Sequence, residues 1–194
     1  MQNGLKGKKR QLRESLLTER MTISEEERQE AESRIASRFL NLASFRFAET
    51  VLLYAPIKGE IDLLSICHAV LNLGKQLAFP RCHDDGCTMT YHLVSSLNEL
   101  ACGRYGIREP LEGAPLYLPS PDKHDVCVVP AVCFDKSGYR VGYGKGYYDR
   151  FLSQFGGTTV GLVMHRFLLP EVPRGRFDRS VDLILTEKGV FPTR

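Results

Sequence analysis

The chain has 194 residues, of which 43% are hydrophobic and 25% are charged, and we expect a single globular domain over residues 1–194. No apolar run approaches membrane-spanning length, and the basic N-terminus lacks the apolar stretch of a signal peptide, so no membrane partner is expected. The net charge of +3 is local, because six cations outnumber two acids within the first twenty residues. A local basic cluster of this kind suits a polyanion, although a solvated helix face has the same pattern.

In chain order, apolar residues at helical spacing predict helices over residues 5–20, 24–44, 62–73 and 147–154. Short apolar runs predict strands over 50–55, 76–80, 89–94, 125–132, 158–164 and 181–186. Residues 95–124 are rich in Pro and Gly and are expected to be mostly loop, with one helical turn at 96–100. Strands that alternate with helices indicate a three-layer α/β fold, with a mainly parallel sheet and helices on both faces.

The six cysteines form no Cys-x-x-Cys pair, and several of them lie in apolar stretches. Unpaired cysteine in such a place behaves as a small hydrophobic residue. We therefore expect a reducing, cytoplasmic compartment rather than a disulfide framework, and no zinc site.

The most informative segment covers residues 138–150 and reads Gly-Tyr-Arg-Val-Gly-Tyr-Gly-Lys-Gly-Tyr-Tyr-Asp-Arg. Its alternating glycines, Gly142, Gly144 and Gly146, permit positive φ and let a ligand approach the backbone closely. Successive amide N–H groups of such a loop can point inward as a nest for an anion. The segment matches neither the Walker A pattern nor the dinucleotide fingerprint, and a plain glycine-rich turn above packed aromatic residues is the alternative interpretation.

Charged residues around these glycines favour a polyphosphate ligand. Lys145 supplies a mobile point charge and Arg140 a forked donor, and the N-terminus of the following helix also favours phosphate. Asp149 is either a metal ligand beside the phosphates or an ordinary acid in the first turn of a helix. Lys9 and Arg13 share a face of the first predicted helix, but their spacing alone does not bring them to this loop.

Other candidates are less specific. Glu60 follows the first predicted strand at its carboxyl end, where ligands of α/β folds are bound. Asp178 is a second metal ligand or, as the pattern alone favours, a surface acid. Tyr143, Tyr147 and Tyr148 either stack on a planar ring or pack beneath the loop. The sequence shows no Ser/His/Asp arrangement and no histidine pair with metal-ligand spacing.

The segment from Arg140 to Leu152 resembles, almost position by position, the signature of the 5-formyltetrahydrofolate cyclo-ligase family, also called methenyltetrahydrofolate synthetases. The similarity runs in order over residues 9–190, through Lys9-x-x-x-Arg13, Glu60, Phe79-Pro80-Arg81, Gly106–Pro110, Phe177-Asp178 and Val181–Glu187. The resemblance implies a fold like that of sugar-phosphate isomerases and CoA-transferases. It also implies ATP-dependent closure of 5-formyltetrahydrofolate to 5,10-methenyltetrahydrofolate with release of ADP and phosphate, through phosphorylation of the formyl oxygen and attack by N10.

Residue roles follow from the same resemblance. ATP would be bound by Lys9, Arg13, Arg140, Gly142, Tyr143, Gly144, Lys145, Gly146, Tyr147 and Tyr148. The folate substrate would be bound by Ala55, Glu60, Tyr143, Gly144, Lys145, Gly146 and Tyr147. Lys145 and Arg140 would act in catalysis, and Asp149 and Asp178 would hold Mg²⁺. The expected partners are these two small molecules, without nucleic acid or membrane, and the chain is expected to be a monomer.

Two positions depart from the pattern of the family. Phe167 stands where many members have glutamine, and Cys82 stands where some have an aromatic residue, so folate-side contacts are expected to differ. Tyr105 aligns loosely with an aromatic position near the folate. The alternatives are a ligase or kinase of another small substrate, a folate-storage or nucleic-acid-binding protein, and an inactive relative. The presence of Glu60, Lys145 and Asp149 counts against the first and the last of these.

Overall fold

The structure is a computed structural model that describes residues 2–57, 59–119 and 124–193, so the predicted loop at 120–123 lies outside the described part. Its centre is a seven-stranded sheet with the order β12-β11-β9-β6-β1-β2-β3. These strands are β1 (Thr50–Leu52), β2 (Gln76–Cys82), β3 (Met89–Val94), β6 (Val126–Val129), β9 (Thr158–Leu162), β11 (Leu183–Thr186) and β12 (Gly189–Pro192). The neighbouring pairs β11–β9, β9–β6, β6–β1 and β1–β2 are parallel, whereas β12 and β3 pair antiparallel at the two edges.

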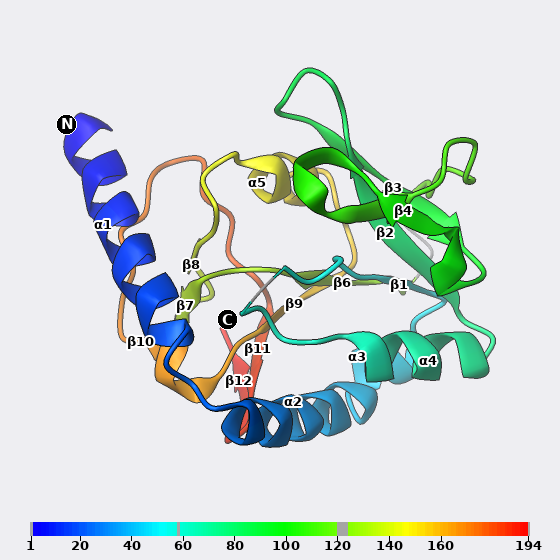
Figure 1. The fold of residues 1–194 in the computed structure, drawn as a ribbon, viewed down its shortest axis with the longest axis horizontal. Coiled ribbons are helices and arrows are strands. Elements are labelled where there is room, and N and C mark those ends of the chain that lie inside the picture. The colour runs from blue at the N-terminus through cyan, green and yellow to red at the C-terminus, as the bar shows by residue number, and fades with distance from the viewer. Residues whose placement is uncertain (1, 58, 120–123, 194) are drawn as a thin grey trace.

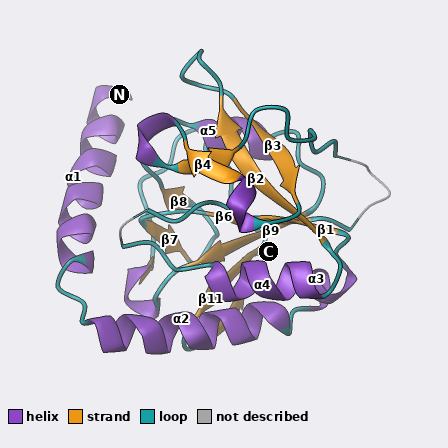
Figure 2. Ribbon diagram, turned by 45° about the vertical axis from the view of Figure 1, so that its right-hand side comes forward, coloured by secondary structure: helices purple, strands orange, loops and turns teal. Residues whose placement is uncertain are grey.

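Helices cover both faces of this sheet (Figure 1). The helices α2 (Glu25–Leu40), α3 (Ala43–Phe47) and α4 (Leu64–Asn72) lie on one face, and α5 (Tyr147–Leu152) lies on the other. The long helix α1 (Gln2–Arg20) stands at the side of the sheet, as Figure 2 also shows. The predicted three-layer α/β fold with a mainly parallel sheet is confirmed.

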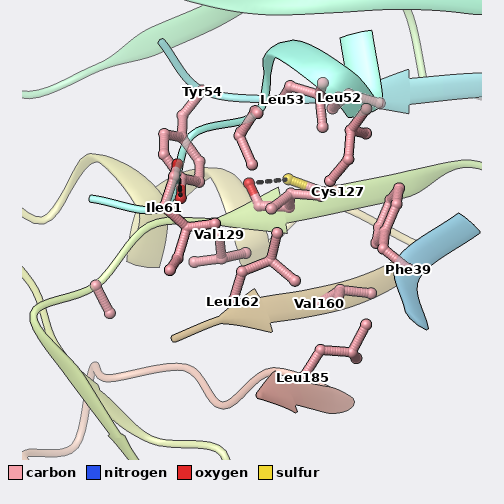
Figure 3. Packing of buried hydrophobic residues seen from close by; sticks show 14 of the residues in the cluster. Phe39, Leu52, Leu53, Tyr54, Ile61, Cys127, Val129, Val160, Leu162 and Leu185 are labelled. Atoms are coloured by element: carbon pink, nitrogen blue, oxygen red, sulfur yellow. Dashed lines mark hydrogen bonds between the residues drawn. The ribbon is translucent and has the colours of Figure 1, made fainter. Parts of the chain in front are cut away.

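The core is built from strands that are buried on both faces. All four residues of β6, Val126 to Val129, are fully buried, as expected for a central parallel strand between helical layers. Figure 3 shows side chains of β1, β6, β9 and β11 gathered in one cluster with Phe39 of α2. Burial of a side chain such as Phe39 stabilises the fold by about 1.5–3 kcal/mol.

The second predicted helix is wrong in its extent. Ser24 does cap it, since its hydroxyl accepts a hydrogen bond from the Glu27 amide at 3.1 Å. The helix ends at Leu40, however, because the Asn41 side chain bonds back to the Ser37 carbonyl at 2.8 Å and Leu42 is extended. The remaining residues form the separate helix α3.

Several predicted strands and helices are shorter in the structure, and the predicted loop 95–124 is partly wrong. It contains η1 (Leu97–Glu99), the hairpin of β4 (Leu100–Cys102) and β5 (Arg108–Pro110), and the short turn η2 (Arg104–Gly106). A second small sheet, also not predicted, joins β10 (Leu168–Leu169), β7 (Cys133–Asp135) and β8 (Arg140–Val141), and η3 (His165–Phe167) precedes β10. Elements of two or three residues are too short to show a hydrophobic period.

The strand order predicts a ligand site between β1 and β6. From β1 the chain crosses through α4 to β2 on one side, whereas β6 pairs with β1 on the other side. Ligands of open α/β sheets bind at such a switch point, beyond the carboxyl ends of the strands. No helix of the described residues is long and apolar enough to cross a membrane.

Candidate active site

A cavity of about 820 Å³ opens at the switch point. Tyr54 and Ala55, which follow β1, line it together with Pro130, which follows β6. The cavity brings together all residues that the sequence proposed for the site: Lys9, Arg13, Ala55, Glu60, Arg140, Gly142, Tyr143, Gly144, Lys145, Gly146, Tyr147, Tyr148, Asp149 and Asp178. Residues from both ends of the chain therefore share one site.

The glycine loop follows β8 and leads into α5. Gly144 has φ of +95° and Gly146 has φ of +72°, conformations that side-chain-bearing residues rarely adopt. A Cβ on Gly144 would also lie only 3.3 Å from Nη2 of Arg13. Arg150 fixes the loop from below, because its guanidinium donates to the Lys145 carbonyl at 2.7 Å. Helix α5 has only six residues, so its dipole contributes little positive charge at the glycine loop. Most of the positive charge around the loop therefore comes from cationic side chains.

Helix α1 delivers two cations to this loop. Lys9 Nζ lies 2.5 Å from Asp178 Oδ2, and Arg13 Nε donates to the Gly142 carbonyl at 2.6 Å. Sequence spacing alone did not predict these contacts, although it did place both residues on one helix face. Lys6 and Arg10 line the cavity as well and were missed, although each lies three residues before Lys9 or Arg13, the spacing of one helix face.

Arg140 and Asp149 form the floor beside the loop. Arg140 is only 7% exposed, and its Nη2 lies 2.8 Å from Asp149 Oδ1 while its Nη1 donates to the Arg179 carbonyl at 2.7 Å. The Arg179 amide donates to the same Asp149 oxygen at 3.1 Å, and the Gly175 amide donates to Asp178 Oδ2 at 2.6 Å. In these contacts, each aspartate uses one carboxylate oxygen: Oδ1 of Asp149 and Oδ2 of Asp178.

The donor set at the two aspartates fits a magnesium ion that arrives with phosphate. Among the described residues, no group of three or more His, Cys, Asp or Glu side chains forms a ready protein-only metal site. Magnesium prefers one or two carboxylates together with phosphate oxygens and water. Asp149 and Asp178 both face the cavity and can present a carboxylate to such an ion.

Glu60 lies on the other side of the cavity. It is 8% exposed, and its Oε2 accepts a hydrogen bond from the Ile57 amide at 2.9 Å. Burial raises the pKa of its carboxyl group, whereas the Ile57 amide, Tyr143 and Arg20 act to lower that pKa. A buried carboxylate is a strong acceptor for N–H groups of a ligand.

Tyrosines form the wall between the two sides. Tyr148 is held from below by the Tyr91 hydroxyl at 3.3 Å, so this residue packs as well as lines the cavity. At the mouth, the hydroxyls of Tyr105 and Tyr147 lie 3.5 Å apart, and Lys145 Nζ lies 5.7 Å from the centre of the Tyr105 ring. Tyr105 itself has φ of +59°, so the chain holds this ring over the loop at some conformational cost.

The two departures from the family pattern have different locations. Cys82 lines the cavity, whereas Phe167 is 1% exposed and is not part of the cavity lining. Pro80, Ile107 and Glu109 also line the cavity, and they belong to blocks that the resemblance covers without a stated role. The remaining lining residues are mostly apolar and carry no motif: Tyr54, Ile57, Met89 and Pro130.

Comparison with known proteins decides the family. A model of the 5-formyltetrahydrofolate cyclo-ligase family matches residues 5–187. The chain belongs to this family. Cyclo-ligases are ligases, so the protein is an enzyme, and the resemblance read from the sequence is confirmed.

Relatives of this cyclo-ligase support the assignment over nearly its full length. It is 30% identical over 194 residues to the 5-formyltetrahydrofolate cyclo-ligase of Mycolicibacterium smegmatis, an alignment that covers 96% of this chain and 97% of the relative. It is 27% identical over 179 residues to the 5-formyltetrahydrofolate cyclo-ligase of Escherichia coli K12, and this alignment covers 89% of this chain and 96% of the relative. The NMR structure of Aquifex aeolicus 5,10-methenyltetrahydrofolate synthetase superimposes with a TM-score of 0.85 at 37% identity, covering 96% of this chain and 93% of that one.

Proposed function

We propose that this cyclo-ligase converts 5-formyltetrahydrofolate and ATP to 5,10-methenyltetrahydrofolate, ADP and phosphate. The observation that carries the proposal is a single cavity that joins a cation-rich glycine loop to a buried carboxylate, Glu60. The loop suits a polyphosphate, and the carboxylate suits the N–H groups of a pterin. Both substrates would then lie in one enclosure, which lowers the entropic cost of bringing them together.

The chemistry requires a better leaving group on the formyl carbon. In the proposed sequence the formyl oxygen attacks the γ-phosphorus of ATP, and the bond to the β-bridging oxygen breaks to release ADP. The N10 lone pair then attacks the activated carbon, N10 loses its proton, and the carbon–oxygen bond breaks to release phosphate. No protein nucleophile is needed, so the enzyme would act by positioning and by neutralising charge.

The nucleotide side has residues for both tasks. Gly142 to Tyr148 would cradle the phosphates, while Lys9 and Arg13 would reach them from α1. Lys145 would stabilise charge on the moving phosphoryl group, and Arg140, fixed by its two hydrogen bonds, would hold the adjacent oxygens. Asp149 and Asp178 would hold a Mg²⁺ ion, which would neutralise phosphate charge when bound.

The folate side is defined by Glu60, with Ala55, Tyr143 and Tyr147 as further contacts. Because Glu60 is buried, water competes little for its carboxylate. A ligand N–H group placed there would form a charge-assisted hydrogen bond with it. We also propose that the chain acts on these small molecules as a cytoplasmic monomer, without nucleic acid. Size-exclusion chromatography with light scattering would test the oligomeric state.

The deciding experiment mixes the purified protein with magnesium, ATP and 5-formyltetrahydrofolate and follows the near-ultraviolet absorbance of the methenyl product. Reactions without ATP, and with ADP in its place, are the controls. ATP-dependent growth of the product band supports the proposal. If no product forms but ATP still raises the thermal midpoint, the proposal that the protein binds ATP is supported. In that case the molecule that accepts the phosphoryl group is not 5-formyltetrahydrofolate.

A further inference from the structure

Arg150 of α5 lies outside the cavity lining but is hydrogen-bonded to the glycine loop. Its Nη2 donates to the Lys145 carbonyl at 2.7 Å, and its Nε donates to the Cys87 carbonyl at 2.6 Å. Side chains on a helix lean toward its N-terminus, which explains how Arg150 reaches back to the loop that precedes α5. Cys87 lies in the turn between β2 and β3, residues 83–88. We call these two hydrogen bonds the Arg150 bridge, because they join the glycine loop to this turn.

The turn presents the Cys87 carbonyl in a fixed position. The Asp85 carboxylate accepts hydrogen bonds from the Cys87 and Thr88 amides, each at 2.8 Å, and from the Thr88 hydroxyl. The His83 amide closes the turn by donating to the Thr88 carbonyl at 2.9 Å. The Cys87 carbonyl and the Thr88 amide belong to one planar peptide group, so the bond to Asp85 also fixes the acceptor of Arg150.

The glycine loop needs an external contact to hold its backbone. Lys145 stands between Gly144 and Gly146, whose φ values are +95° and +72°. Glycine loses more conformational freedom on ordering than any other residue. Because the Lys145 side chain is exposed, its position depends chiefly on where its backbone is held, and the Arg150 bridge holds that backbone at the Lys145 carbonyl.

The Arg150 bridge also orients the peptide group between Lys145 and Gly146. Every described peptide bond is trans, so the carbonyl and the N–H of this group point in opposite directions. Holding the Lys145 carbonyl therefore turns the Gly146 N–H away from Arg150, as an anion nest on the cavity side requires. Gly146 also leaves room for the guanidinium, since a Cβ there would lie only 3.0 Å from Nη1 of Arg150.

We propose that Arg150 is a positioning residue that sets Lys145 and the Gly146 amide by joining the glycine loop to the β2–β3 turn. The strands on either side of that turn supply Cys82 and Met89 to the cavity wall, so the Arg150 bridge links two walls of one cavity. The kinetic part of this inference rests on the proposed function. The bridge itself does not, because it is measurable in the unliganded protein.

Two simpler roles would leave different signatures. If Arg150, which is exposed, only added positive charge near the loop, lysine would replace it fully. If Arg150 only anchored the turn, its loss would lower stability without affecting the step that Lys145 serves. A positioning role instead predicts that the effect of losing Arg150 depends on Lys145 and on Asp85.

The first test compares Arg150→Met with Arg150→Lys in the cyclo-ligase assay. Arg150→Met is expected to lower kcat by about 10–100-fold, since a misplacement of roughly 1 Å can have an effect of this size. Arg150→Lys should share most of the loss, because one ammonium replaces the two nitrogens of the bridge. Arg38→Met is the matched control, since Arg38 donates to a backbone carbonyl within α2 and lies outside the cavity. Normal kcat in either Arg150 variant would overturn the inference.

The second test is a pair of double-mutant cycles. In a Lys145→Ala background, Arg150→Met should lower kcat by no more than about threefold, because the residue that it positions is already gone. Asp85→Ala alone should reproduce part of the Arg150→Met loss and should add little to it. Glu112→Ala is the control, because Glu112 is an exposed acid outside the cavity. Additive losses in either cycle would overturn the inference.

The third test needs no substrate. Amide hydrogen exchange of residues 142–146, measured by mass spectrometry in the unliganded protein, should speed up by roughly tenfold in Arg150→Met, the effect of losing one charged hydrogen bond. Asp85→Ala should speed it up less, and this variant serves if Arg150→Met does not fold. Unchanged exchange in both variants would overturn the inference. If the unaltered protein shows no cyclo-ligase activity, the proposed function fails, and the exchange measurement still decides whether the bridge holds the loop.

Discussion

Replacing Lys145 with alanine should separate catalysis from stability. Lys145 is exposed in the glycine loop, and its one described ring contact is the approach of Nζ to Tyr105 at 5.7 Å. An exposed cation–π contact contributes about 0.5–1 kcal/mol. For a domain of this size, that corresponds to a fall in the thermal midpoint of about 1–4 °C.

The effect on turnover should be far larger. If Lys145 stabilises charge on the moving phosphoryl group, its loss should lower kcat by about 10²–10³, or about 2.7–4 kcal/mol, by comparison with loss of one preorganised donor elsewhere. The assay is the absorbance of the methenyl product at saturating ATP, with thermal unfolding measured on the same samples. Lys188→Ala is the matched control, because Lys188 is exposed and lies outside the cavity. A folded Lys145→Ala protein with normal turnover would remove this lysine from the mechanism.

Three further changes test other parts of the site. Asp178→Asn should raise the Mg²⁺ concentration needed for half-maximal activity or weaken ATP binding; an unchanged magnesium titration would contradict the metal role. Gly144→Ala should lower the thermal midpoint by about 2–8 °C and raise KM for ATP, because φ is +95° there, whereas Gly156→Ala, with open space around its Cβ, should change neither. Glu60→Gln should weaken binding of the folate but not of ATP by isothermal titration calorimetry. Because burial raises the folded pKa of Glu60, its ionised form costs stability, so this variant should unfold at a higher temperature near pH 8, with the gain vanishing as the pH falls below about 4.5.

The sequence predicted the elements that carry a strong hydrophobic period. The strand at residues 125–132 and the helix after Ser24 were found because buried β-branched residues and a capping box are local signals. The β7–β8 hairpin was not found, because its strands have two or three residues and are held by pairing with each other and with β10. Such pairing is a property of the assembled fold rather than of the local sequence.

The part of the candidate site that one contiguous segment forms could be predicted from the sequence. The segment from Arg140 to Asp149 combines glycines with charges, and its residue types alone indicated a polyphosphate. Lys6 and Arg10 line the cavity but could not be assigned to it in this way, because a basic residue on a basic helix has the same pattern as any solvated cation. Their approach to the loop depends on the docking of α1 through the contacts of Lys9 with Asp178 and of Arg13 with Gly142, which are more than a hundred residues away in sequence.

The contacts of α1 also bear on the order in which the protein folds. Lys9 and Asp178 are separated by 169 positions, and Arg13 and Gly142 by 129. Forming contacts this distant in sequence has a larger entropic cost of loop closure than forming the strand pairs of the sheet. Such contacts therefore tend to form late. Helix α1 would therefore be among the last of the described elements to dock. A chain that stops before residue 178 would lack the Lys9 partner, so the proposed nucleotide site would be complete only once Asp178 is present.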